Sequence, residues 1–239
     1  MIKVFHCHPR SPNQREISKA FEAGGFDITT DLHTPADIHV ISGPNFAYEA
    51  YIGKPNVLMV NRAFWGDGDK NKKVSIGWLQ ANGTRKFATG EAPRPKPKMQ
   101  PWKTRENSCI VLPDYSANMK MNGKSIDAVR RDAAARFGKA TVRLHPAGYK
   151  GERPTLMDDI SKHDVAIGGL GTSVFEAIIL GVPVICDPLN ACAAVAATDM
   201  SAPLVRPDRT QWLHDLSYAQ FSLAEIANGT AWNLLKDAR

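Results

Sequence analysis

The sequence predicts an α/β protein with two parallel sheets, each in a domain of its own. Short apolar runs alternate with segments of helical spacing, as expected for parallel strands joined by crossover helices. The chain has 239 residues, enough for two small domains with separate cores. A proline-rich segment, residues 92–102, lies between two such groups of elements. We therefore expect an N-terminal domain at residues 1–102, a C-terminal domain at 103–208 and closing helices at 209–239.

In the N-terminal domain, buried strands are expected at residues 2–6, 26–29, 38–42, 56–61 and 74–79. After the first strand, residues 14–23 place Ile17, Ala20 and Phe21 on one helical face, and Gly24 marks the end of that helix. Regular structure is not expected in the proline-rich segment, because proline lacks a backbone N–H and fixes φ.

In the C-terminal domain, strands are expected at residues 109–112, 141–144, 164–167 and 182–186, and helices at 125–137 and 156–162. The tail at 209–235 is expected to be helical, with Trp212, Tyr218, Phe221 and Trp232 as aromatic anchors.

The most informative stretch is residues 163–188, which predicts a strand, a glycine loop, a buried helix and a second strand. Gly169 and Gly171 permit a sharp turn and a close backbone approach. Thr172 or Ser173 is expected to cap the helix, with Glu176 at capping-box distance from Ser173. A glycine loop that opens onto a helix N-terminus suits a phosphate, whereas tight packing alone is the alternative explanation.

The residue order in this stretch resembles the donor-binding unit of GT-B glycosyltransferases. The matching pattern is an Asp followed by three apolar residues and Gly, then Thr-Ser, Phe-Glu-Ala and finally Gly-Val-Pro-Val-Ile. The resemblance covers mainly residues 107–188. It implies two Rossmann-like domains that face a cleft, with C-terminal helices that cross back onto the N-terminal domain. It also implies a nucleotide-sugar donor as co-substrate, with no permanently bound cofactor.

The resemblance places the donor's phosphates on the glycine loop and its ribose on Glu176. Arg143 and His145 follow a strand, where open α/β sheets bind ligands, and Arg-x-His-Pro resembles a motif of glycan and polyol-phosphate transferases. The alternative is that Arg143 pairs with a carboxylate and His145 caps a turn. The expected donor-binding residues are Arg143, His145, Gly169, Gly171, Thr172, Ser173 and Glu176.

Glycosyl transfer also requires a base that deprotonates the acceptor hydroxyl. Asp67 follows the fourth strand and is the favoured candidate, while His6 and His8 at the end of the first strand are rivals. Asp67 and Asp69 also resemble the DxD metal motif of another glycosyltransferase fold. A turn is the simpler explanation of Asp-Gly-Asp, so a divalent metal is not favoured.

The chain carries a net charge of +6, and basic residues dominate residues 85–105. They are interpreted as contacts to a polyanion such as DNA, and a solvated linker is the alternative. The expected nucleic-acid contacts are Arg85, Lys86, Arg94, Lys96 and Lys98. No apolar run approaches the roughly 20 residues of a membrane span. Four widely spaced cysteines indicate reduced thiols and a cytoplasmic location.

Small size, basic charge and cytoplasmic thiols resemble phage enzymes that glycosylate hydroxymethylated pyrimidines in DNA, which would place the protein in the host cytoplasm. The first functional hypothesis is therefore a glycosyltransferase with DNA as its acceptor. One alternative is a transferase acting on a cell-envelope glycan, and another is a non-transferring relative such as an epimerase. A third, from another class, is a nucleic-acid-binding protein with a vestigial Rossmann pair. The sequence does not specify the sugar or the oligomeric state.

Overall fold

The computed structural model describes residues 2–6, 12–31, 33–42, 48–65, 73–114, 120–121, 124–145 and 154–239. The chain forms two compact units, which are residues 1–96 together with 210–239 (unit 1) and residues 97–209 (unit 2). The first break therefore precedes the expected boundary at residue 102. Its position follows from backbone hydrogen bonds, because Gln100 N–H donates to Ile179 and Lys103 N–H donates to Gly181 inside unit 2.

Unit 1 contains a seven-stranded sheet with the order β13-β5-β4-β3-β1-β2, in which β6 also pairs with β5. Strands β2, β1, β3 and β4 are parallel, whereas β5 runs antiparallel to β4 and β13 antiparallel to β5. Its elements are β1 (Lys3–His6), α1 (Pro12–Ala23), β2 (Asp27–Thr29), β3 (Ile38–Ser42), α2 (Tyr48–Tyr51), β4 (Val57–Arg62), β5 (Lys73–Leu79), β6 (Arg85–Lys86), α6 (Thr210–Ser217), β13 (Gln220–Ser222), α7 (Leu223–Ala227), α8 (Thr230–Leu235) and η3 (Lys236–Ala238).

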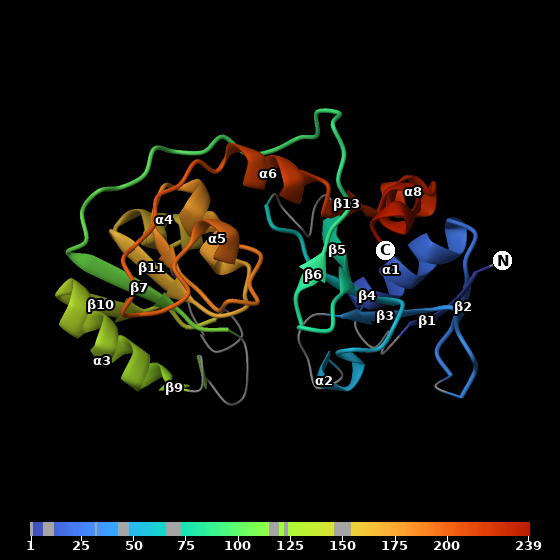
Figure 1. Cartoon of the computed structure of the whole chain (residues 1–239), viewed down its shortest axis with the longest axis horizontal. Coiled ribbons are helices and arrows are strands. Elements are labelled where there is room, and N and C mark those ends of the chain that lie inside the picture. Colours follow the sequence, from blue (N-terminus) through green and yellow to red (C-terminus); the bar gives the residue numbers. More distant parts are fainter. Residues whose placement is uncertain are drawn as a thin grey trace. The chain divides into compact units, whose positions relative to one another are not determined.

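Alternating side chains of the central strands build a core on each face of this sheet. Val40 and Leu58 join a large cluster with residues of α1, α7 and α8. Ile41 and Met59, one position further along their strands, join a smaller cluster with Tyr51 of α2. Figure 1 shows α1 and α8 on one side of these strands and α2 on the other.

The tail of unit 1 differs from the continuous helical segment expected at 209–235. Strand β13 interrupts it and pairs with the start of β5, with Phe221 opposite Val74. Phe221 is completely buried in the core. Burial of this side chain and pairing with β5 therefore outweigh the helical pattern of the local sequence. Ser222 then caps α7 through a capping box with Glu225.

Unit 2 contains a four-stranded, all-parallel sheet with the order β10-β7-β11-β12. One face packs on α3, whose Val129, Ala133 and Phe137 are buried against Cys109 and Val165 of the sheet. Its elements are β7 (Ser108–Leu112), β8 (Lys120–Met121), β9 (Lys124–Ser125), α3 (Ile126–Phe137), β10 (Lys139–Val142), α4 (Leu156–Ser161), β11 (Val165–Gly168), α5 (Ser173–Ile179), β12 (Val184–Ile185) and η2 (Ala193–Val195). The expected helix at 125–137 is confirmed, with Ser125 as its N-cap.

The apolar strands of both units are buried in these three clusters. Among the residues that the structure describes, no helix is long and apolar enough to cross a membrane. Cys109, Cys186 and Cys192 are buried free thiols. Burial raises the pKa of Cys109 and of Cys186 to about 12, so both thiols stay protonated at neutral pH.

Both units place their four parallel strands in the same order. In each sheet the first strand in sequence lies between the second and the third, as in β2-β1-β3-β4 and β10-β7-β11-β12. Ligands of such sheets bind at the carboxyl ends of the first and third strands, where the winding reverses. In unit 1 the residues that follow β1 and β3 lie outside the described residues. In unit 2 the corresponding residues after β7 and β11 are described.

The two arginines expected to contact nucleic acid are engaged inside unit 1. Arg94 donates to the carbonyls of Ser217 and Gln220 and pairs with Glu225 at 2.8 Å. Arg85 donates to the Ser75 hydroxyl, and its guanidinium lies over the ring of Phe87. Arg94 therefore joins the proline-rich segment to the tail, and Arg85 joins β6 to β5, so both guanidinium groups already have partners inside unit 1.

Arg94 is expected to matter for stability. Because it bonds two backbone carbonyls and a carboxylate from a largely buried position, Arg94→Ala should lower the free energy of unfolding by about 2 to 3 kcal/mol. Urea denaturation measures the change, and Lys98→Ala, at an exposed position nearby, should stay within about 0.5 kcal/mol of the wild type. An Arg94→Ala protein as stable as the wild type would contradict the assignment.

Candidate functional site

The carboxyl ends of all four strands of unit 2 contribute to one edge. His145 lies three residues beyond β10, and Asp114 two residues beyond β7. The glycine loop, residues 169–172, follows β11, and Asp187 lies two residues beyond β12. Because the strands are parallel, these segments meet at the same side of the sheet, and the β7–β11 pair is the point where the winding reverses.

Asp114 binds the glycine loop across this point. Its two carboxylate oxygens accept hydrogen bonds from Leu170 N–H at 2.7 Å and Gly171 N–H at 2.6 Å. Charge-assisted bonds to backbone amides are among the stronger hydrogen bonds in proteins. The amide of Gly171, which was expected to meet a donor phosphate, therefore bonds to a carboxylate of the chain itself.

Asn190 holds the same loop from its carbonyl side. Its side-chain amide donates to Gly169 C=O at 2.8 Å and to Gly171 C=O at 3.1 Å. A β-carbon at Gly169 or Gly171 would collide with the carboxylate of Asp114. Glycine is thus required at both positions because Asp114 packs directly on the backbone, and the loop is fixed from two sides.

The ionisation of Asp114 is set by opposing influences. Burial raises the pKa of its carboxyl group, and the two backbone hydrogen bonds from Leu170 and Gly171 lower it. The neighbouring charge of Asp187 raises the pKa further, whereas His145 lowers it. The net direction is upward, so the site contains a partly buried carboxyl group that takes up a proton more readily than an exposed aspartate.

The N-cap of the helix after the loop is Thr172, one of the two residues expected there. Its backbone is already in the right-handed helical region, and its side chain makes no capping hydrogen bond. Ser173 is the first helical residue, so the capping box expected between Ser173 and Glu176 is wrong. The turn is closed by the backbone instead, since Phe175 N–H donates to Thr172 C=O at 3.0 Å.

The Arg143 side chain bonds to the segment that leads into α4 and to α4 itself. Its guanidinium pairs with Asp159 of α4 and donates to Pro154 C=O at 2.9 Å, and 11% of its side chain is exposed. Arg143 therefore anchors the segment that leads into α4, which is the alternative that the sequence left open. His145 lies close enough to Asp114 to influence its charge.

Neither a protein-family model nor a curated protein matches the sequence. Two solved structures from Thermosulfurimonas dismutans KpsC have a similar fold. The first, its beta Kdo 2,7 transferase, has a TM-score of 0.54 and 14% identity over 98% of this chain and 99% of that chain. The second, its beta Kdo 2,4 transferase, has a TM-score of 0.55 and 14% identity over 93% of this chain and 92% of that chain.

This likeness shows that the chain has the fold of these transferases. It extends over nearly the whole length of both proteins, so it covers unit 1 as well as unit 2. At 14% identity it does not carry the activity over to this chain, which must be argued from the site.

Several residues expected in the acceptor half lie beyond what the structure describes. Asp67 and His8 are outside the described residues, and His6 is described only as the last residue of β1. Within the described ranges, no group of three or more His, Cys, Asp or Glu side chains is arranged to hold a metal ion.

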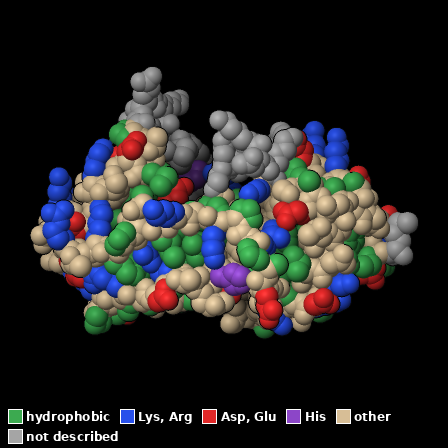
Figure 2. Space-filling model, turned by 90° about the horizontal axis from the view of Figure 1, so that it is seen from above, with side chains coloured by type: hydrophobic (Ala, Val, Ile, Leu, Met, Phe, Trp, Pro, Cys, Tyr) green, Lys and Arg blue, Asp and Glu red, His purple; other side chains and the backbone are tan. Residues whose placement is uncertain are grey.

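Of the remaining basic residues, Lys86 donates to Arg239 C=O at 3.3 Å, and Lys96 and Lys98 are exposed. Figure 2 shows Lys and Arg side chains interspersed with hydrophobic, acidic and neutral surface on the face in view.

Asp114 is expected to make the stability of the protein fall as pH rises. Because its folded pKa lies above the usual 3.8, the folded chain binds this proton more tightly than the unfolded chain does. The free energy of unfolding should therefore decrease from about pH 4 up to the folded pKa and level off above it.

Urea denaturation of the wild type and Asp114→Asn, from about pH 3.5 to about pH 7, isolates this contribution. The free energy of unfolding of the wild type, minus that of Asp114→Asn, should decrease as pH rises. Asp127→Asn, at an exposed position on α3, controls for the substitution itself. A difference that rises with pH would mean that the amide hydrogen bonds outweigh burial.

Proposed function

We propose that this protein is a glycosyltransferase of the GT-B type that takes a nucleotide-activated sugar and acts on a cell-envelope glycan. The observation that carries the proposal is the Asp114–glycine loop contact at the switch point of unit 2. The fold of two Kdo transferases, shared over nearly the full chain, supports it by analogy.

The donor is assigned to the carboxyl edge of unit 2. Two loop amides are already bonded to Asp114, so the proposed contacts to the donor's phosphate come from His145, Thr172 and Ser173. Glu176, one turn into α5, is proposed to contact the ribose. Asp114 and Asn190 keep the loop in one shape, which lowers the conformational entropy lost when the donor binds.

The chemistry assigned to this edge is electrostatic. A sugar that leaves its phosphate develops positive charge at the anomeric carbon, and a fixed carboxylate nearby stabilises that charge. Asp114 is the proposed carboxylate, because it is held in place by two amides and is only partly exposed. For the acceptor-side base, Asp67 remains the proposal, with His6 and His8 as rivals.

The acceptor is proposed to be a glycan rather than DNA. Arg85 and Arg94, two of the five expected DNA contacts, are used inside unit 1. Both similar structures are named as transferases of Kdo, which is an eight-carbon sugar acid. A sugar acid or a glycan that contains one is therefore the first substrate class to test.

The proposal predicts transfer to a glycan. Purified protein is incubated with UDP-, GDP- and CMP-linked sugars, including an activated form of Kdo, and with envelope oligosaccharides or hydroxymethylated DNA. Mass spectrometry should detect a sugar added to the oligosaccharide and none on the DNA. Asp114→Asn should lower turnover by about 10²- to 10³-fold, the usual cost of removing one electrostatic stabiliser.

Asp127→Asn on α3 is the matched control and should keep wild-type turnover. Sugar transfer to DNA would reinstate the first hypothesis from the sequence, and wild-type turnover in Asp114→Asn would remove Asp114 from the site.

A separate prediction concerns the loop. In Gly171→Ala the new methyl group collides with the Asp114 carboxylate, so the loop must shift and donor affinity should fall by at least about tenfold. Calorimetric titration with the nucleotide sugar measures this, and Ala135→Val, at an exposed position on α3, is the control for added bulk. Unchanged donor affinity in Gly171→Ala would place the donor elsewhere.

A further inference from the structure

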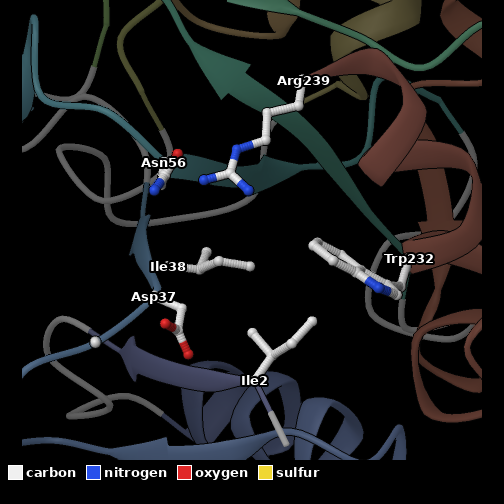
Figure 3. Close-up of a pocket in the computed structure, with 7 residues that line it drawn as sticks. Ile2, Asp37, Ile38, Asn56, Trp232 and Arg239 are labelled. Carbon is white, nitrogen blue, oxygen red and sulfur yellow. The ribbon is translucent and has the colours of Figure 1, made fainter.

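Unit 1 contains a pocket of about 360 Å³ at the amino ends of its parallel strands, whereas the Asp114 site lies at the carboxyl ends of the strands of unit 2. It is lined by Ile2, Ala36, Asp37, Ile38, Asn56, Trp232 and Arg239. Figure 3 shows the side chains of Ile2, Ile38, Trp232 and Arg239 extending toward a common space. The volume falls in the range of small-molecule sites, which begins at about 300 Å³.

The position of the pocket separates it from a donor site. Ile2 immediately precedes β1, Asp37 immediately precedes β3, and Asn56 immediately precedes β4. The pocket therefore lies at the amino ends of the parallel strands of unit 1, closed by α8 and the turn after it. Sheets of this topology bind their main ligand at the carboxyl ends, so this pocket is a candidate for a second ligand.

The wall contributed by α8 is a fixed aromatic side chain. Trp232 packs edge-on against Phe26 at 5.3 Å and against Trp78 at 6.3 Å between ring centroids. These contacts hold the indole in one orientation while it stays partly exposed to the pocket. With Ile2 and Ile38, it forms an apolar surface suited to the flat C–H face of a sugar ring.

Polar groups lie around this apolar surface. In Figure 3 the guanidinium of Arg239 extends into the pocket near Asn56. Asn56 has a left-handed backbone (φ 61°) that asparagine tolerates well, and its carbonyl accepts His39 N–H at 2.9 Å. Asp37 is held by Lys3 N–H at 2.8 Å and brings a carboxylate to the rim. The pocket thus offers a cation, an amide and a carboxylate.

We infer that this pocket binds a sugar acid of one or two rings and so holds an acidic glycan away from the transfer site. Arg239 pairs with the acid group, the ring lies against Trp232, and Asn56 and Asp37 bond to ring hydroxyls. A neutral sugar lacks the acid group with which Arg239 can form charge-assisted hydrogen bonds. An aromatic amino acid lacks the ring hydroxyls that Asn56 and Asp37 are proposed to bond. The carbohydrate class rests on the proposed function, whereas the acid group follows from Arg239.

The test is a titration of the full chain without any nucleotide sugar, followed by ligand-observed saturation-transfer NMR. The probes are Kdo and galacturonic acid, with galactose and phenylalanine as the neutral and zwitterionic comparisons. Both acids should bind saturably and more tightly than either comparison. Because a charged hydrogen-bond partner is lost, Arg239→Ala should weaken acid binding by about tenfold or more.

Two further variants sharpen the result. Asn56→Gly keeps the left-handed backbone while it removes the amide, and should weaken binding of the acids and of galactose alike. Lys236→Ala removes an exposed cation of η3 that does not line the pocket, and should leave binding unchanged.

The inference is overturned if neither acid binds, if galactose or phenylalanine binds as tightly as the acids, or if Arg239→Ala binds them like the wild type. Because no donor is present, this result is independent of whether the protein transfers a sugar. Saturable, Arg239-dependent acid binding in a protein without transfer activity would uphold the pocket and reject the proposed function.

Discussion

The contact between one carboxylate and two consecutive backbone amides is the constraint on which the described site depends. Asp114 lies 56 residues from Leu170, and the contact exists because β7 and β11 are neighbours in the sheet. A partly buried carboxylate needs charge-assisted bonds to offset its lost hydration, and the glycine loop supplies them. The same contact favours glycine at 169 and 171, because a β-carbon at either position would collide with the Asp114 carboxylate.

This dependence explains what the sequence could and could not predict. The helix at α3, the buried strands and the glycine loop have local signals, namely a period, a cap and the conformational freedom of glycine. Asp114 has none, because Pro-Asp-Tyr after a strand has the composition of an ordinary turn. The signal that would have found it is topological. It is an acid just beyond the first strand of a parallel sheet whose third strand ends in a glycine loop.

The basic segment shows the same limit for electrostatics. Arg94 and Lys98 are alike in composition and only four residues apart, yet Arg94 bonds the carbonyls of Ser217 and Gln220 while Lys98 is exposed. The difference arises because strand β13, which pairs antiparallel with β5, brings Gln220 and its neighbours to Arg94. A count of charges cannot distinguish a surface cation from one that joins two segments 123 residues apart.

The proline-rich segment extends this argument from side chains to the backbone. Its composition correctly excludes helix and strand, because proline cannot donate a backbone hydrogen bond. Its carbonyls still accept hydrogen bonds. Arg209 donates to Gln100 C=O at 2.7 Å, and the central carbon of its guanidinium lies 3.8 Å from the centroid of the Trp102 ring. Trp102 in turn donates to Pro207 C=O at 2.8 Å. The end of this segment, from Gln100 on, is therefore fastened to unit 2 by hydrogen bonds that it both accepts and donates, and it covers the end of α5 at Gly181.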